Sequence, residues 1–203
     1  MTAARIPLPR LHAVTDERIT RLPDFDDRAR ALGAAGAALH ARGHTLAGRA
    51  HLTLARRLAA AAPDRLFVND RADVALAAGA AGVQLPADGL SPADARRLGP
   101  HWWIGVSVHG LAAARAARDL GADYLLVGPV HRTPTHPDVL PLGLAGLAPF
   151  VALGLPVVAI GGVEAADGRA LADAGAYGVA AIRALWDAPD PGAAARAMLK
   201  ELA

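Results

Sequence analysis

Residues 156–183, PVVAIGGVEAADGRALADAGAYGVAAIR, carry the pattern that decides the fold. The stretch opens with five apolar residues in a row, which is typical of a strand buried on both faces of a parallel sheet. Gly161 and Gly162 follow, a helix is predicted over 163–174, and another strand over 178–182. A strand, a glycine turn, a helix and a second strand make one repeating unit of an α/β protein.

The turns after these two strands predict a phosphate site. Paired glycines at the end of a strand let the backbone approach a ligand closely and turn its amides outward. The predicted phosphate-binding residues are therefore Gly161, Gly162, Ala181, Ile182 and Arg183. In (β/α)₈ barrels, the turns after the seventh and eighth strands form such a site. The alternative is that the glycines serve only the geometry of a tight turn.

The rest of the chain repeats the same alternation of strand and helix. Strands are predicted over 11–14, 37–41, 66–68, 82–85, 102–108 and 124–127, and helices over 24–32, 46–62, 71–78, 92–98, 111–120, 144–153 and 191–201. With the two strands of the opening stretch, this makes eight strands and no linker. The predicted fold class is α/β, a single (β/α)₈ TIM barrel that forms one domain over residues 1–203.

Composition excludes several classes of function. The 21 basic and 19 acidic residues are spread along the chain, so no nucleic-acid partner is predicted. Without cysteine there is no thiolate catalysis, and a single lysine, Lys200 near the C-terminus, is poorly placed for Schiff-base chemistry. No apolar run has the length of a signal peptide or a membrane span, so a cytoplasmic protein without a membrane partner is expected.

Polar residues gather at the predicted strand ends, where barrel enzymes carry out their chemistry. The set is His40, Arg42, Asn69, Asp70, Ser107, His109, His131, Thr133, Thr135, His136 and Arg183. The longest irregular segment, GPVHRTPTHPDVLPLG (128–143), follows the sixth strand. Long ordered loops inside compact domains tend to be functional, so this loop is predicted to belong to the active site.

Six segments in order resemble the thiamine phosphate synthase and TenI family. They are LHAVTD (11–16), LHARG (39–43), LFVNDRADVALAAGAAGVQL (66–85), IGVSVH (104–109), GADYLLVGPV with TPT (121–135), and VVAIGGV with AGAYGVAAI (157–182). The resemblance covers nearly the whole chain. It implies a (β/α)₈ barrel, a small-molecule thiazole phosphate as substrate, and a homodimer as the family-based expectation.

Two activities occur in that family, and the departures from its pattern bear on the choice. Synthases join hydroxymethylpyrimidine diphosphate to thiazole phosphate and use Mg²⁺, and Asn69 and Asp70 match the family's first magnesium-side pair, so Asp70 is the predicted metal ligand for a synthase. The second metal carboxylate falls on Gly89, and lysines of the family fall on His44 and His136. Neutral histidines are poor substitutes for the cations that a departing diphosphate needs.

A TenI-type thiazole tautomerase is therefore the first prediction, because moving a proton to aromatise a thiazole carboxylate phosphate needs one phosphate site, an acid/base group and no cofactor. The family's histidine after the sixth strand is Pro129 here, so His131 and His40 are the predicted catalytic residues. The predicted substrate-binding residues are Arg42, Asn69, Asp70, Ser107, His109, Thr133, Thr135 and His136.

Several alternatives stay open. Thiamine phosphate synthase with Mg²⁺ is the second function, and a non-catalytic binder of thiazole or thiamine phosphates is the third. Asn69 and Asp70 have a structural alternative at a strand end and helix cap, and His131 has one as a packed residue at the base of its loop.

Overall fold

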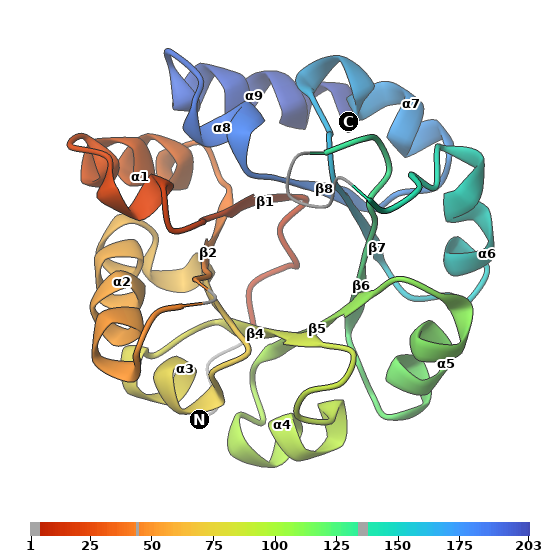
Figure 1. The fold of residues 1–203 in the computed structure, drawn as a ribbon, viewed down its shortest axis with the longest axis horizontal. Helices are drawn as coiled ribbons and strands as arrows, with labels where there is room; N and C mark the ends of the chain where they lie inside the picture. Colours follow the sequence, from red (N-terminus) through yellow and green to blue (C-terminus); the bar gives the residue numbers. More distant parts are fainter. Residues whose placement is uncertain (1–4, 44, 134–137) are drawn as a thin grey trace.

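The computed structural model describes residues 5–43, 45–133 and 138–203, which build a closed barrel of eight parallel strands (Figure 1). Each strand pairs with the next along the chain, and β8 pairs with β1. The strands are β1 (Leu11–Val14), β2 (Ala38–Ala41), β3 (Leu66–Asn69), β4 (Gly82–Pro86), β5 (Trp103–Val108), β6 (Tyr124–Val127), β7 (Val157–Ile160) and β8 (Gly178–Ala181). The predicted (β/α)₈ fold is confirmed.

Helices surround the barrel and lie between successive strands along the chain (Figure 1). They are α1 (Phe25–Ala34), α2 (Gly48–Ala61), α3 (Ala72–Ala78), α4 (Pro92–Leu98), α5 (Leu111–Asp119), α6 (Ala148–Val151), α7 (Gly168–Asp173), α8 (Arg183–Trp186) and α9 (Pro191–Glu201). Because parallel strands need a crossover between them, this alternation places every carboxyl strand end at the same end of the barrel.

Three helices differ from the sequence prediction. The predicted helix 144–153 is a 3₁₀ turn (Ala145–Leu147) followed by the short α6, and 163–174 is a 3₁₀ turn (Ala165–Asp167) followed by α7. In the second case Glu164 and Asp167 exchange hydrogen bonds between side chain and backbone, a capping box that tightens the first turn. The third difference is α8, which the sequence analysis did not predict and which begins directly after β8.

The strands are buried on both faces, so their side chains alternate between two cores. Outward residues pack against the helices, whereas inward residues fill the barrel. The inward apolar set is Leu8, Val14, Ala38, Phe67, Tyr124, Leu126, Val158 and Ala180. Glycines make room for the two large rings, because a Cβ at Gly82 would lie 2.6 Å from Phe67 Cε1 and one at Gly105 would lie 2.2 Å from Tyr124 Cζ. The interior is therefore packed solid rather than hollow.

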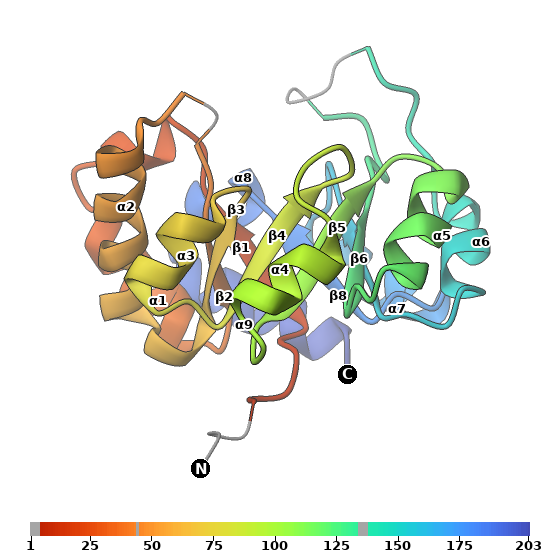
Figure 2. The same cartoon turned by 90° about the horizontal axis from the view of Figure 1, so that it is seen from below.

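The segment that precedes β1 lies at the amino end of the barrel (Figure 2). The Arg5 guanidinium lies 3.4 Å from the ring centroid of Trp103 and bonds to the Asp123 carboxylate, and Trp103 Nε1 donates to Ile6 O at 3.0 Å. These contacts hold the segment against β5. Within the described ranges, none of the helices combines the length and the hydrophobicity that a membrane span needs.

Candidate active site

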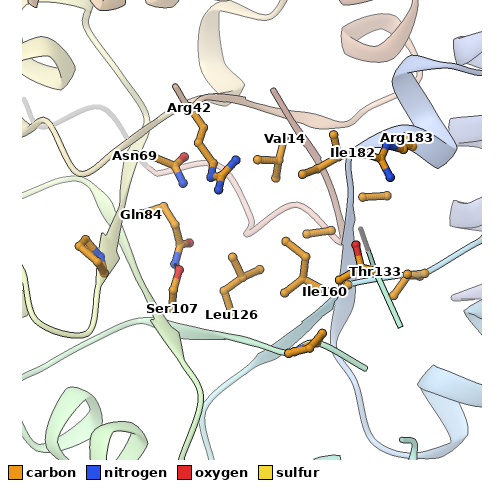
Figure 3. A pocket seen from close by; sticks show the side chains of 18 of the residues that line it. Val14, Arg42, Asn69, Gln84, Ser107, Leu126, Thr133, Ile160, Ile182 and Arg183 are labelled. Carbon is orange, nitrogen blue, oxygen red and sulfur yellow. Dashed lines mark hydrogen bonds between the residues drawn. The ribbon is translucent and has the colours of Figure 1, made fainter. Parts of the chain in front are cut away.

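A cavity of about 710 Å³ opens at the carboxyl end of the strands, a size typical of small-molecule sites. Its lining divides into two polar ends separated by an apolar floor of Val14, Leu126 and Ile160 (Figure 3). We call the end formed by Arg42, Asn69, Asp70, Gln84, Ser107 and His109 the side-chain end. We call the end formed by Gly161, Gly162 and residues 181–184 the backbone end.

Arg42 stands at the side-chain end because the ends of β1 and β2 are tied together. The hydroxyl of Thr15 accepts a hydrogen bond from Arg42 N, and Thr15 Oγ1 lies 2.9 Å from the carbonyl oxygens of both His40 and Arg42. Burial lowers the pKa of Arg42, and the negative charges of Glu17 and Asp16 oppose that shift. An arginine starts from so high a pKa that it keeps its charge near neutral pH. Arg42 therefore brings a partly buried positive charge to the cavity.

Ser107 is oriented by a chain of hydrogen bonds that starts inside the barrel. The buried Tyr124 hydroxyl donates to Gln84 Oε1 at 2.7 Å, and Gln84 Nε2 donates to Ser107 Oγ at 3.0 Å. Burial raises the pKa of Tyr124, so the phenol keeps the proton that it donates. Because Ser107 Oγ accepts from the amide, its own hydrogen is directed elsewhere, and Ser107 can act as a donor toward a ligand.

Asp70 is held in a backbone conformation that is uncommon for a residue with a side chain. Its φ is +66°, in the left-handed region, and its N–H donates to Gln84 O at 2.9 Å. The cap position of α3 is Arg71, and no side-chain hydrogen bond caps that helix, so Asp70 is not its cap. A Cβ placed on Gly89 would lie 3.5 Å from Asp70 Oδ1. The position where the family's second metal carboxylate was expected therefore lies beside Asp70 and carries no side chain here.

The backbone end consists of main-chain groups with left-handed glycines. Gly161 and Gly162 have φ values of +98° and +67°. A Cβ on Gly161 would lie 2.6 Å from Pro129 Cβ, and one on Gly162 would lie 2.6 Å from Arg132 O. Both positions therefore require glycine for steric reasons, as the alternative in the sequence analysis supposed. The steric reason is compatible with a phosphate site, because the same turn and residues 181–184 line the cavity.

The structure places neither predicted catalytic histidine in the cavity lining. His40 is fully buried below the floor, where its ring bonds to His12 and to the Asn69 side chain. His131 lies behind the glycine turn: its backbone N–H donates to Gly161 O, and its Nε2 lies 3.5 Å from Asp167 Oδ1. His40 occupies an inward position of β2, so its ring lies in the barrel core. The loop after β6 turns at His131, so that ring points away from the cavity.

The other predicted residues divide into two groups. The cavity lining includes Arg42, Asn69, Asp70, Ser107, His109, Thr133, Gly161, Gly162, Ala181, Ile182 and Arg183. His109 Nδ1 lies 3.0 Å from Gly128 O, which orients that ring at the edge of the side-chain end. Thr135 and His136 lie outside the described residues, as does His44.

Sequence reasoning missed lining residues that change the charge of the cavity. Arg71 and Arg132 join Arg42 and Arg183 in the lining, against the carboxylates of Asp70 and Glu164, so the described lining is net positive. Arg71 follows Asn69 and Asp70 directly in the sequence, and Arg132 lies within the long loop. Their positions after predicted strands could therefore have identified both as candidate site residues. The cations expected from the family resemblance were lysines, whereas these two are arginines.

The carboxylate of Asp70 could contribute to a Mg²⁺ site. Among the residues that the structure describes, no cluster of three His, Cys, Asp or Glu side chains could hold an ion by itself. Mg²⁺ is commonly held by one or two carboxylates together with phosphate oxygens of the substrate. Asp70, exposed in the cavity lining, fits that partial role.

Comparison with known proteins adds an independent observation. A family model described as thiamine monophosphate synthase matches residues 11–185. The chain belongs to this family. The family resemblance drawn from the six sequence segments is thus confirmed, and the chain belongs with enzymes of thiamine biosynthesis.

Two curated relatives and one solved structure illustrate the similarity. The chain is 42% identical over 200 residues to the thiamine-phosphate synthase of Methanoculleus marisnigri, with 95% of each chain covered. It is 51% identical over 140 residues to the thiamine biosynthesis bifunctional protein ThiM/ThiE of Symbiobacterium thermophilum, covering 68% of this chain but only 29% of that longer protein. The structure of thiamine phosphate pyrophosphorylase from Pyrococcus furiosus is similar with a TM-score of 0.81, 31% identity and 95% of each chain covered.

Proposed function

We propose that this chain is a thiamine-phosphate synthase, which joins hydroxymethylpyrimidine diphosphate to a thiazole phosphate. The observation that carries the proposal is the cavity with two polar ends on an apolar floor (Figure 3). Two substrates that each bear phosphate groups need a place for a diphosphate and a place for a phosphate, with their rings between them. The tautomerase substrate bears one phosphate and one carboxylate, so it needs no place for a diphosphate.

The relatives favour this reaction over the tautomerase that the sequence analysis ranked first. Three relatives that match the chain over nearly its full length bear the name thiamine-phosphate synthase. The positions of His131 and His40 agree with that preference, because neither side chain lines the cavity. A proton-transfer mechanism through either ring would need the ring to reach the substrate.

In the proposed mechanism, the side-chain end takes the diphosphate. Arg42 supplies permanent positive charge there, and Ser107 donates a hydrogen bond. Arg71 also lines the cavity, with its guanidinium bonded to the Asp73 carboxylate. Arg42 and Ser107 stabilise the charge that builds up as the bond to the diphosphate breaks and the bond to the thiazole forms. Arginine thereby supplies the cations that lysine provides elsewhere in the family.

Asp70 is the residue that would hold Mg²⁺ together with the diphosphate oxygens. When bound, the ion supplies positive charge that stabilises the leaving diphosphate. Gly89 offers no second carboxylate beside Asp70, so the ion would depend on substrate oxygens and water for its other ligands. We therefore expect Mg²⁺ to bind weakly in the absence of the diphosphate substrate.

The backbone end takes the phosphate of the thiazole. Main-chain amides of Gly161 and Gly162, and those of residues 181–183, face this part of the cavity in the proposal. Arg183 and Thr133 line the same end and add polar side chains. The apolar floor keeps water away from the rings where they meet.

The proposal is tested by incubating the purified protein with both synthase substrates and Mg²⁺ and measuring thiamine phosphate and pyrophosphate. Formation of both products in equal amounts is expected. The tautomerase is tested in parallel by following aromatisation of thiazole carboxylate phosphate without metal. Aromatisation without thiamine phosphate formation would reverse the order of the two functions, and thermal stabilisation by the ligands without either turnover would support a silent binder.

A further inference from the structure

A chain of three side chains runs from the barrel interior to the side-chain end of the cavity. His12 Nε2 lies 2.9 Å from Pro9 O, and His12 Nδ1 lies 2.8 Å from His40 Nε2. His40 Nδ1 in turn lies 3.1 Å from Asn69 Oδ1. Both histidines are fully buried, and Asn69 lines the cavity. The interior end of this chain is a carbonyl, and the outer end is a side chain that a ligand can touch.

Both rings are neutral in this environment. They pack against Phe67 and Tyr124, which offer no charge to balance a cation. Burial lowers the pKa of His12 to about 4 and places that of His40 well below its usual value, with the neighbouring His12 adding to the second shift. Each ring therefore carries one N–H and one acceptor nitrogen.

The carbonyl of Pro9 determines which ring nitrogens of His12 and His40 carry a proton. A carbonyl only accepts, so His12 must carry its proton on Nε2 and accept with Nδ1. His40 must then donate from Nε2 to His12, which leaves His40 Nδ1 as an acceptor. An acceptor at that nitrogen needs a donor on Asn69.

The amide of Asn69 can meet that need in only one of its two orientations. With Oδ1 toward His40, two acceptors face each other. Rotating the amide by 180° exchanges oxygen and nitrogen within almost the same volume, so that Nδ2 donates to His40. We propose that His12 and His40 are positioning residues that hold the Asn69 amide with Nδ2 inward and Oδ1 toward the cavity.

The orientation of the Asn69 amide affects which ligands can bind, and it does not depend on the proposed reaction. Asn69 Oδ1 would accept from a ligand N–H or O–H, and a ligand group that only accepts would be disfavoured at this point. Ser107, oriented by Gln84, offers the opposite polarity nearby, because its hydroxyl is directed to donate. The side-chain end would thus select ligands by an acceptor at one position and a donor at another.

Nitrogen-15 NMR of the histidine side chains tests the proposal on the ligand-free protein at neutral pH. We expect both His12 and His40 as neutral rings protonated on Nε2. A proton on His40 Nδ1 would overturn the proposal, because Asn69 would then accept and turn Nδ2 toward the cavity. The signals are read without substrate, so this test can fail while the synthase proposal stands, and the reverse is also true.

Two variants test whether Pro9 or Asn69 determines which nitrogen of His40 is protonated. In Asn69→Ala, His40 should keep its proton on Nε2, because the chain is set from Pro9, whereas a switched or mixed tautomer would show that Asn69 sets it and overturn the proposal. In His12→Phe, His40 loses its acceptor and should populate both tautomers. Asn69→Ala alters only a residue at the cavity edge, so the test does not depend on whether the buried His12→Phe variant folds.

Discussion

In the proposed function both ends of the cavity bind phosphate groups, one through side chains and the other through the main chain. The side-chain end consists of arginine, amide, hydroxyl and carboxylate groups that project from β2, β3 and β5 or follow them. The backbone end consists of a glycine turn after β7 and the turn into α8 after β8. The first can be changed one functional group at a time, whereas the second can be changed only by moving the main chain. The two ends should therefore respond to different substitutions.

The largest effect is expected from Asp70→Asn at the side-chain end. Removing the only carboxylate that we assign to Mg²⁺ should lower synthase turnover on the order of a thousandfold, the scale of losing a main electrostatic contributor. Thiazole phosphate affinity at the other end should change little. Asp64→Asn is the matched control, because Asp64 is exposed, precedes β3 at the opposite end of the barrel and is outside the cavity lining. Equal losses in both variants would remove Asp70 from the mechanism.

A lower pH should reduce the free energy of unfolding through the buried histidines beneath the side-chain end. The folded pKa of His12, about 4, lies below its unfolded value of about 6.5. Below pH 6.5 the unfolded chain therefore takes up a proton that the folded chain does not, and stability is lost as the pH falls toward 4. The loss should reach about 3 kcal/mol for this group, and the lowered pKa of His40 acts in the same direction.

Urea unfolding at several pH values between 7 and 4 measures this loss. A variant without the titrating ring, His12→Gln, should show a flatter dependence over that range. The same slope in both proteins would mean that His12 does not supply the effect. Carboxylates also begin to titrate at about pH 4 to 5, so the difference between the two proteins, rather than the slope of either one, reports on His12.

At the backbone end, Gly162→Ala should raise the Kd for thiazole phosphate by about tenfold or more. The new Cβ would lie 2.6 Å from Arg132 O, in a left-handed conformation that costs about 1–2 kcal/mol for a residue with a side chain. Gly79→Ala is the matched control, since Gly79 has nearly the same φ, +66° against +67°, and nothing within 4 Å of its Cβ position. Isothermal titration should show lost affinity in Gly162→Ala alone, although both variants lose stability. Unchanged affinity in Gly162→Ala would leave these glycines with a purely steric role.

The smallest effect is expected at His131, behind the glycine turn. If the protein is a synthase, His131→Ala should change turnover by less than about threefold, because the ring lies beside Asp167 rather than in the cavity lining. Steady-state kinetics on both candidate reactions would check this. A hundredfold loss, the scale of general acid/base catalysis, would restore the role predicted from the sequence and the tautomerase with it.

Sequence alone determined the barrel and 11 of the 27 residues that line the cavity. Uninterrupted apolar strands, glycine turns and helical spacing are local patterns, and each predicted strand was found within one or two residues of its place. The strand-end residues Arg42, Asn69, Asp70 and Ser107 were found in the lining because parallel strands bring their carboxyl ends together. The two predicted helices 144–153 and 163–174 were less accurate, because each begins as a 3₁₀ turn and only its later part is α-helical.

Only the tertiary structure decided which way the side chains point and how the charges of the cavity sum. His40 was predicted at a strand end, but the two-residue alternation of a strand directs it inward, where it meets His12, a residue 28 positions away in the sequence. Arg71 and Arg132 come from loops after different strands, so their contribution to one cavity appears only when the barrel closes. Local patterns specify elements, whereas the polarity and charge of a site depend on contacts between residues far apart in the chain.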